Sequence, residues 1–276
     1  MVLLGSWKEN ERVSDTFIAI NYGIKTGYNK AFIIDSETRS TLIAQDPKSF
    51  EIVKPILRGR DIQRYRAQWA GLWLLYCHSK LSEYSYPAIR QHLLPHKERL
   101  LRRRGGASPR TGKVPYQWWQ LQVDYFNSGA YQEFSKEKLF WMDMSNRGRF
   151  AYSDSEMYCN DKGFIMTGES LKFLCAVLNS ALITWLMKCT ALTTGMGLIQ
   201  WKKFAVERLP VPRITISEQR PFIDLVDSIL SAELDNPSTD ALQLQAEIDK
   251  LVYAKYELSQ QEIVHLESIQ RDKSFS

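Results

Sequence analysis

The sequence predicts an α+β protein with a mixed, largely antiparallel twisted sheet, packed helices and a C-terminal helical hairpin. Three observations lead to this prediction: short β-branched or aromatic segments between turns, one long apolar segment, and helical spacing beyond a proline-rich connector. The chain has 276 residues, of which 44% are hydrophobic and 24% charged. This length and composition are enough for a sizeable core in one or two domains.

Short strands are expected where β-branched or aromatic residues stand between turn residues. They are predicted at residues 17–21, 31–35, 72–77, 138–144, 149–152 and 163–166. A helix begins at Tyr86-Pro87 and is kinked by Pro95, while residues 171–187 are expected to form a buried helix. That segment is too short and too polar to span a bilayer, so no membrane association is expected. Residues 1–210 are interpreted as one body.

The composition changes at residues 209–212, Leu-Pro-Val-Pro, which form a stiff, extended connector. Beyond it, apolar residues keep helical spacing over residues 218–233 and 239–269. The charge changes too: residues 51–110 hold thirteen Lys and Arg against four Asp and Glu, whereas residues 214–270 hold three against eleven. We expect residues 211–276 to form an acidic helical hairpin that packs on the body or on a partner, and the basic region to bind a polyanion.

Two neighbouring motifs carry the functional signal: GIKTGYNKAFIID at residues 23–35 and IVKPILRGRDIQRY at residues 52–65. In the first, glycines let backbone approach a ligand closely, although a plain tight turn is the alternative. In the second, arginines offer planar forks of donors to phosphates and base edges, although a solvated basic face is the alternative. The residues expected to bind nucleic acid here are Lys25, Thr26, Tyr28, Asn29, Lys30, Arg58, Arg60, Arg64 and Arg66.

Two further basic clusters fit the same role. Arg102, Arg103 and Arg104 stand beside a glycine pair, as is typical of side chains that follow a phosphate backbone. Arg147 and Arg149 flank a glycine, which is the pattern of a turn tip that enters a groove. The neighbouring Trp118 and Trp119 are candidates either for stacking on bases or for the core.

No catalytic centre and no metal site are expected. His92 and His96 are four apart, but the HExxH glutamate is missing and Pro95 disturbs the helix between them. Asp35 with Asp46-Pro47-Lys48 fits the letters of a metal-dependent nuclease, an alternative that the proline disfavours. The glycine loop lacks the GxxxxGK[ST] spacing of a phosphate cradle, which disfavours nucleotide hydrolysis.

The asparagine-proline-proline-aromatic signature of amino-group methyltransferases is missing. Four scattered cysteines without CxxC spacing, and no apolar run at the amino terminus, lead us to expect a reduced, cytoplasmic protein.

The order of several motifs resembles a known family. After the two motifs quoted above follow LWLLY, YPAIRQHLL, LNS, a pair of glycines and LPVP, and then EID and LVY in the tail. In this order they resemble the C-terminal specificity domain of TaqI-like adenine-specific DNA methyltransferases and type IIG restriction–modification enzymes. The resemblance covers roughly residues 17–267.

The resemblance implies that residues 1–210 form a target recognition domain for double-stranded DNA, with no activity alone. It also implies a separate methyltransferase domain or subunit, which binds S-adenosyl-L-methionine and methylates the N6 of a flipped adenine, while this chain binds no cofactor itself. Two other interpretations stay open: the specificity subunit of a type I system, and the metal-dependent DNA endonuclease.

Overall fold

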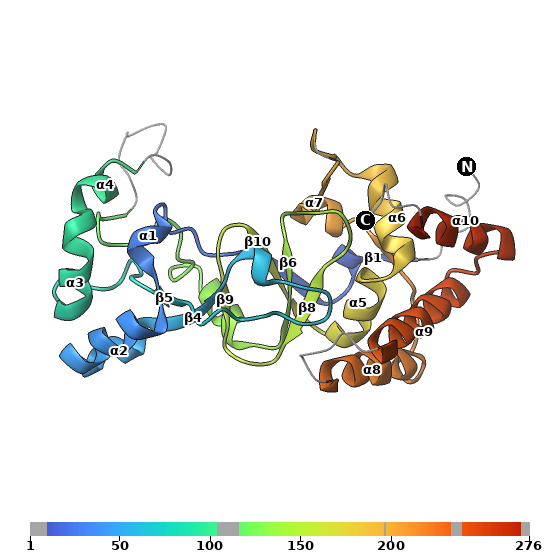
Figure 1. Ribbon diagram of the computed structural model, residues 1–276, viewed down its shortest axis with the longest axis horizontal. Helices are drawn as coiled ribbons and strands as arrows, with labels where there is room; N and C mark the ends of the chain where they lie inside the picture. The colour runs from blue at the N-terminus through green and yellow to red at the C-terminus, as the bar shows by residue number, and fades with distance from the viewer. Residues whose placement is uncertain (1–9, 104–115, 196, 233–238, 272–276) are drawn as a thin grey trace.

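An antiparallel sheet lies at the middle of the molecule's long axis in the computed structural model (Figure 1). Its strands follow the order β2 (Ile18–Tyr22), β10 (Gly163–Gly168), β6 (Lys138–Met142) and β8 (Phe150–Ser153). The structure describes residues 10–103, 116–195, 197–232 and 239–271.

The central sheet separates two hydrophobic cores, because successive side chains of a strand point to opposite faces. In β6, Leu139 and Trp141 belong to one core and Phe140 to the other. In β10, Met166 belongs to the first core and Ile165 to the second. Burial on both faces explains why these strands read as continuous apolar runs rather than as alternating patterns.

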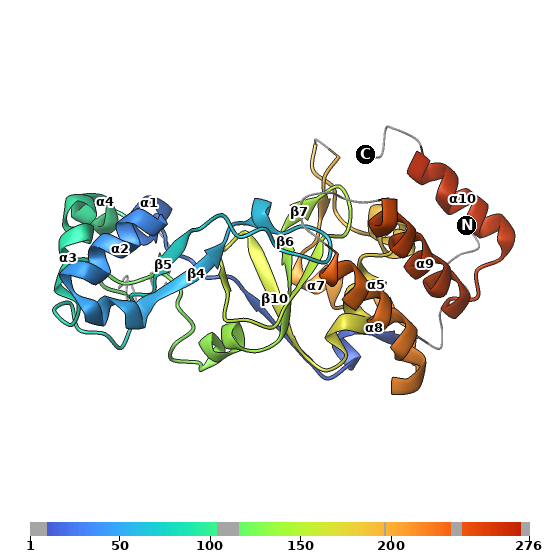
Figure 2. The ribbon, with the colours of Figure 1, turned by 60° about the horizontal axis from the view of Figure 1, so that its bottom comes forward.

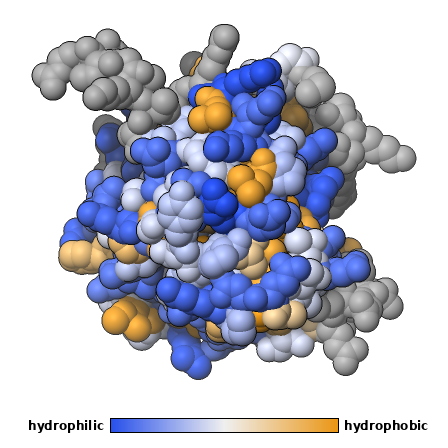
Figure 3. Space-filling model, turned by 90° about the vertical axis from the view of Figure 1, so that its left-hand side faces the viewer, coloured by the Kyte–Doolittle hydropathy of each residue, from blue (hydrophilic) through white to orange (hydrophobic). Residues whose placement is uncertain are grey.

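One side of the central sheet carries a lobe of short helices and a second sheet (left in Figure 1). The helices are α1 (Asn29–Phe32), α2 (Ser36–Gln45), α3 (Pro87–Leu93) and α4 (Lys97–Leu101). The strands follow the order β3 (Ile33–Ile34), β5 (Trp73–Leu75), β4 (Val53–Leu57) and β9 (Tyr158–Cys159), and only β4 and β9 run parallel in this sheet. Figure 3 views this end of the molecule and shows a mostly hydrophilic surface with scattered hydrophobic residues.

The other side carries the remaining helices (right in Figure 1). They are α5 (Leu171–Leu178), α6 (Ala181–Thr190), α7 (Lys203–Val206), α8 (Ile216–Ser231), α9 (Thr239–Lys255) and α10 (Gln260–Arg271). Two short ribbons join this side: β1 (Glu11–Arg12) with β12 (Pro210–Val211), and β7 (Met144–Ser145) with β11 (Ile199–Gln200). The rings of Phe173 in α5 and Phe222 in α8 lie 5.3 Å apart, so the C-terminal helices share the core that backs the central sheet.

The predicted fold class is confirmed, but several element boundaries were wrong. Residues 31–35 were expected to be a strand, whereas a single helical turn precedes β3. The expected helix at residues 171–187 breaks between α5 and α6, where the Ser180 hydroxyl accepts from the Ile183 amide and caps α6. The last expected helix is also broken: Glu257 has φ +52°, and Ser259 caps α10. The kink at Pro95 is confirmed, because a 3-10 turn separates α3 from α4.

Among the described residues, no single helix is long and apolar enough to cross a membrane. Helices α5 and α6 reach that length and composition only as a pair bent by 65°.

A loop of residues 58–68, called the crossing loop below, runs from the end of β4 over the central sheet and back (Figures 1 and 2). The Gln68 amide donates to the Asp61 carbonyl and closes the loop. At its far end, Tyr65 has φ +65° and exchanges backbone hydrogen bonds with β8, of 2.8 Å to Phe150 and 2.9 Å from Tyr152. The buried Tyr65 hydroxyl donates to the Gln245 side chain in α9, so the loop is held by both the sheet and the C-terminal helices.

Candidate nucleic-acid interface

The two sequence motifs meet in one cleft between the lobe and the central sheet. This central cleft has a volume of about 630 Å³. Helix α1, the beginning of the crossing loop, the end of β6, β7 and the turn before β10 form its walls. Its lining residues are Asn29, Lys30, Ile33, Arg58, Gly59, Arg60, Met142, Asp143, Met144, Asn160 and Lys162.

The first motif reaches the cleft through a tightly held glycine loop. Gly27 has φ +73°, a conformation that glycine adopts without strain, and the Thr26 hydroxyl donates to the Asn29 side chain over 2.6 Å. Thr26, a predicted DNA contact, is only 2% exposed, and its hydroxyl shapes the loop. Asn29 and Lys30 are exposed at the cleft, whereas Lys25 is exposed but does not line it.

Tyr28 does not line the cleft either. Its half-buried ring packs edge-on against the His96 ring, with the centroids 5.7 Å apart. The ring of His92 lies 6.2 Å from that of His96, and burial lowers the pKa of His92. Within the described residues, no group of three or more His, Cys, Asp or Glu side chains is placed to hold a metal ion.

The second motif enters the cleft where β4 ends. Arg58 is the first residue after the strand, and its guanidinium is paired with the Asp61 carboxylate at 2.8 Å. Arg60, two residues further, is exposed. Among the described residues, no carboxylate lies within ion-pair distance of Arg60, Lys30 or Lys162. The cleft therefore presents three cations without a counter-charge.

The only acidic side chain that lines the cleft, among the residues described, is Asp143. It is paired with Lys202 at 2.6 Å, and its backbone amide donates to the Lys162 carbonyl over 2.9 Å. Because Lys202 balances this carboxylate, the net charge of the cleft remains positive.

Arg64 and Arg66, both predicted DNA contacts, do not line the cleft, and their guanidinium groups donate to backbone carbonyls. Arg64 donates to the Asn179 carbonyl at the end of α5. Arg66 donates to the carbonyls of Ile229, Leu230 and Ala232 at the end of α8. A cation at these unsatisfied carbonyls complements the negative end of a helix dipole.

Gly148, the expected turn tip, follows a bend at residues 146–147 and packs against the end of α5. A Cβ at Gly148 would lie 2.6 Å from the Leu178 carbonyl oxygen, so only glycine fits there. Arg149 donates to the Gln63 side chain in the crossing loop over 3.3 Å. Arg147 is exposed at the surface. Its pKa is lowered by the partial burial of its charged group and by the charges of Arg64 and Arg149.

Lys188 in α6 belongs to the same group of cations. Its pKa is lowered by burial and by the charge of Arg147. Together with Arg64 and Arg149, these side chains form a second basic cluster, which we call the α6 cluster. Sequence spacing could not reveal Lys188, because it lies about forty positions from the turn that it faces.

Three arginines at the end of α4 were predicted to bind phosphate, and the structure describes two of them. Arg102 is 77% exposed and lies 3.8 Å from Glu98. Arg103 is buried, and its guanidinium donates to the carbonyls of Thr26 at 2.6 Å and Trp118 at 2.9 Å, so in this structure it holds protein segments together. Arg104 lies outside the described residues.

The two tryptophans are also explained by packing. Trp119 is 8% exposed and belongs to the lobe core. Trp118 is half-buried, and the Lys97 ammonium lies 5.1 Å from the centre of its ring. Core packing was one of the two expectations for this pair.

The acidic residues of the nuclease alternative are not assembled. Asp35 caps the beginning of α2 and Asp46 follows its end. Ten helical residues separate them by about 15 Å, which is too far for one metal ion.

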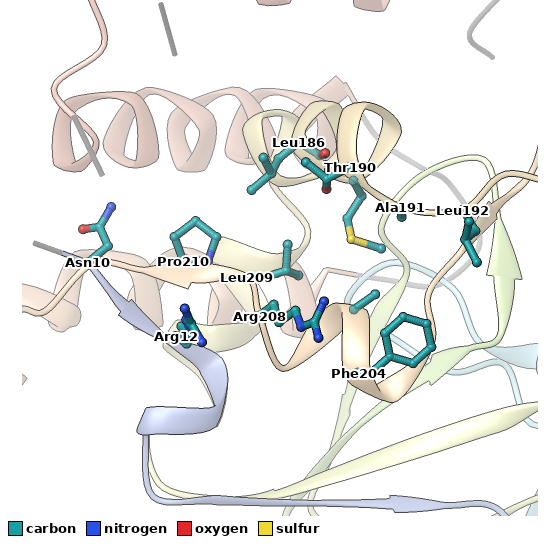
Figure 4. Close-up of a pocket in the computed structure, with 12 residues that line it drawn as sticks. Asn10, Arg12, Leu186, Thr190, Ala191, Leu192, Phe204, Arg208, Leu209 and Pro210 are labelled. Atoms are coloured by element: carbon teal, nitrogen blue, oxygen red, sulfur yellow. Dashed lines mark hydrogen bonds between the residues drawn. The ribbon is translucent and has the colours of Figure 1, made fainter. Parts of the chain in front are cut away.

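A second cavity, of about 400 Å³, lies between α6, α7 and the β1–β12 ribbon (Figure 4). Leu186, Leu192, Phe204 and Leu209 line it, and Arg208 lies beside them (Figure 4). None of the residues predicted to bind nucleic acid lines this cavity.

The family model of the TaqI-like C-terminal specificity domain matches residues 54–211. The fold is similar to that of the type IIL restriction–modification enzyme MmeI, solved in complex with DNA, with a TM-score of 0.67 at 13% identity over 91% of this chain. A second solved structure, the type IIG restriction endonuclease BpuSI, has a TM-score of 0.49 at 13% identity over 90% of this chain.

This chain spans about a third of each solved chain, 34% of MmeI and 32% of BpuSI. A search of curated proteins found no match. The family match covers more than half of the sequence, including β4, the crossing loop, the central strands β6, β8 and β10, and helices α5 and α6. The chain belongs to the family of TaqI-like C-terminal specificity domains.

Proposed function

We propose that this chain is the sequence-specific double-stranded DNA recognition module of an adenine-specific DNA methyltransferase or restriction–modification enzyme. The observation that carries the proposal is the central cleft, in which Lys30 of the first motif and Arg60 of the second have no carboxylate within ion-pair distance among the described residues. Phosphates of DNA are the ligands that such cations attract, and they supply most of the affinity of a DNA-binding surface. The likeness of the fold to MmeI, which was solved with DNA, supports the same ligand.

The lining of the cleft also supports reading of sequence. The exposed Asn29 offers amide hydrogen-bonding groups, while Met142 and Met144 offer apolar surface. Base edges in a major groove differ in their donors, acceptors and methyl groups, so a lining that mixes these types distinguishes base pairs. The cleft is built at the ends of paired strands, which hold such side chains in fixed positions.

The α6 cluster extends this surface along the crossing loop. Gln63 connects the two sites, because it accepts from Arg149 and donates to the Arg60 carbonyl over 3.1 Å. We infer that a duplex seated at the cleft also meets Arg147, which is exposed beside the cluster.

The adenine-specific part of the proposal rests on the resemblance of motifs. A methyltransferase that flips a base needs protein on both flanks of the site, so a separate reading module suits that chemistry. The chain covers only part of the solved enzymes, which supports a methyltransferase domain or subunit as its partner. S-adenosyl-L-methionine belongs to that proposed partner, and we assign no residue of this chain to it.

The test is duplex binding by the 276-residue chain over a range of salt concentrations, with Lys30→Ala combined with Arg60→Ala. We expect weaker binding to every duplex and a log–log salt slope that is flatter by about one for each lost phosphate contact. The matched control combines Lys80→Ala with Lys250→Ala, two exposed cations away from the cleft. An equal loss in both double variants, or an unchanged slope in the first, would contradict the assignment of the cleft.

A further inference from the structure

We propose that Arg58 reads a guanine edge in the bound duplex, with Asp61 as its positioning residue, while Arg60 binds phosphate. This inference rests on the proposed function and divides the arginines of the second motif between two roles. It follows from the different surroundings of two side chains that are only two positions apart.

The carboxylate of Asp61 holds the guanidinium of Arg58 from one side. Nε of Arg58 lies 3.0 Å from Oδ2 and Nη2 lies 2.8 Å from Oδ1, which is a fork-to-fork pair. Asp61 is itself 6% exposed and also accepts from the Arg58 backbone amide over 2.8 Å. No hydrogen bond from Nη1 of Arg58 to another described residue is found. The outer edge of the guanidinium therefore keeps adjacent donors for a ligand.

The backbone under Arg58 is fixed as well. The residue directly follows β4, which pairs with β5 on one side and β9 on the other. The Asp61 amide donates to the Arg58 carbonyl over 2.9 Å and closes a 3-10 turn. A donor pair on such a support keeps one orientation, which base reading requires.

The two arginines differ in charge balance. The Asp61 carboxylate offsets most of the charge of Arg58, so Arg58 attracts a distant phosphate weakly. Arg60 is exposed and has no carboxylate within ion-pair distance among the described residues. Long-range attraction of a polyanion therefore comes from Arg60 and not from Arg58.

Guanine is the base that fits the free edge of Arg58. Its O6 and N7 are two adjacent acceptors in the major groove, and two parallel N–H donors match them. Adenine places a donor beside its acceptor at that edge, cytosine presents an amino donor, and thymine offers one acceptor beside a methyl group. A fixed fork of donors therefore discriminates against the other three bases.

The experiment enriches bound duplexes from a randomised pool with the wild-type 276-residue chain and compares the preferred bases with those of Arg58→Lys. Lysine keeps the charge but loses the planar fork. We expect Arg58→Lys to lose a guanine preference at one position by roughly ten- to a hundredfold, with the salt slope unchanged. Asp61→Asn is expected to weaken the same preference while Arg58 is intact.

The matched control is Arg60→Ala, which should flatten the salt slope by about one and leave the base preferences unchanged. Thermal unfolding of each variant separates misfolding from altered recognition, and Arg58→Lys keeps its partner Asp61. A wild-type chain that binds no duplex at low salt would overturn the proposed function. A wild-type chain that selects a sequence, with the same preferences in Arg58→Lys, would overturn only the role of Arg58.

Discussion

Arg66 donates to the carbonyl of Leu230, a residue 164 positions later in the chain, and so ties the crossing loop to the end of α8. This contact joins the C-terminal helices to the segment that carries Arg58 and Arg60 into the cleft. The acidic helices are therefore part of the support of the proposed reading site, although they pack in the core on the other face of the central sheet.

Removing that tie should cost stability. Arg66→Ala leaves the α8 carbonyls without their charged donor, and we expect the free energy of unfolding to fall by about 2 kcal/mol. Chemical denaturation measures this change. Arg220→Ala is the control, because Arg220 is 72% exposed, pairs only on the surface of α8, and should change stability by less than about 0.5 kcal/mol. Equal losses of stability in Arg66→Ala and Arg220→Ala would contradict a stabilising role for the contact between Arg66 and α8.

Arg102 and Arg103 should behave differently although they are adjacent. Arg103→Ala removes a buried guanidinium that holds the carbonyls of Thr26 and Trp118, so unfolding should become easier by about 3 kcal/mol. Arg102→Ala should leave the melting temperature unchanged, because the side chain is 77% exposed. Thermal unfolding compares the two, and a stable Arg103→Ala chain would contradict the structural role.

Replacing Arg147 with alanine should have opposite effects on the stability of the protein and on its affinity for duplexes. Partial burial and the charges of Arg64 and Arg149 lower the pKa of Arg147, so Arg147→Ala removes a desolvated, repelled charge and should leave stability equal or higher. Binding to duplexes should weaken, with a salt slope lower by about one. Melting curves and salt titrations of the same preparation measure both quantities. A parallel fall of stability and affinity is the result that speaks against the α6 cluster as a contact.

Lys138 gives a pH-dependent prediction. It is fully buried, its ammonium donates to the Ser155 carbonyl over 2.7 Å, and burial lowers its pKa from 10.5 to about 8. Between pH 8 and 10.5 the unfolded chain binds more protons at this residue than the folded chain does, so its contribution to stability rises with pH across that range. Below pH 8 both states are protonated, and the full cost of burying the charge remains.

The measurement is the free energy of unfolding of the wild type minus that of Lys138→Met, followed from pH 7 to above pH 10.5. Taking this difference removes the tyrosines and cysteines, which titrate in the same range. We expect the difference to shift in favour of the wild type as the pH rises. A flat difference would contradict the lowered pKa.

Local patterns predicted the strands of the central sheet and the kink at Pro95, because turn residues and proline act on their immediate neighbours. They could not separate Arg60 from Arg66, since both stand in the same basic run. The difference comes from α8, which folds back onto the crossing loop from more than 160 positions away. Charge alone likewise suggested that Arg103 was a surface residue, whereas carbonyls from three segments enclose it.

Lys162 was missed for a similar reason. It lies in a short polar turn before β10 and carries no motif of its own. Lys162 reaches the cleft through tertiary packing next to Gly59. A Cβ built on Gly59 would lie 3.4 Å from the Cβ of Lys162. The asparagine, aspartate and lysine before Gly163 form a turn signal that could have drawn attention to this position.

The two cores on either face of the central sheet have a consequence for how the protein can diverge. A change at Phe140 disturbs the lobe core, while a change at Leu139 disturbs the core under the helices, so each half can accumulate substitutions with little effect on the other. The crossing loop touches both halves and must satisfy both at once. Exchange of the lobe between relatives should therefore give a folded protein only when the crossing loop and its contact residues on α8 and α9 are exchanged together with the lobe.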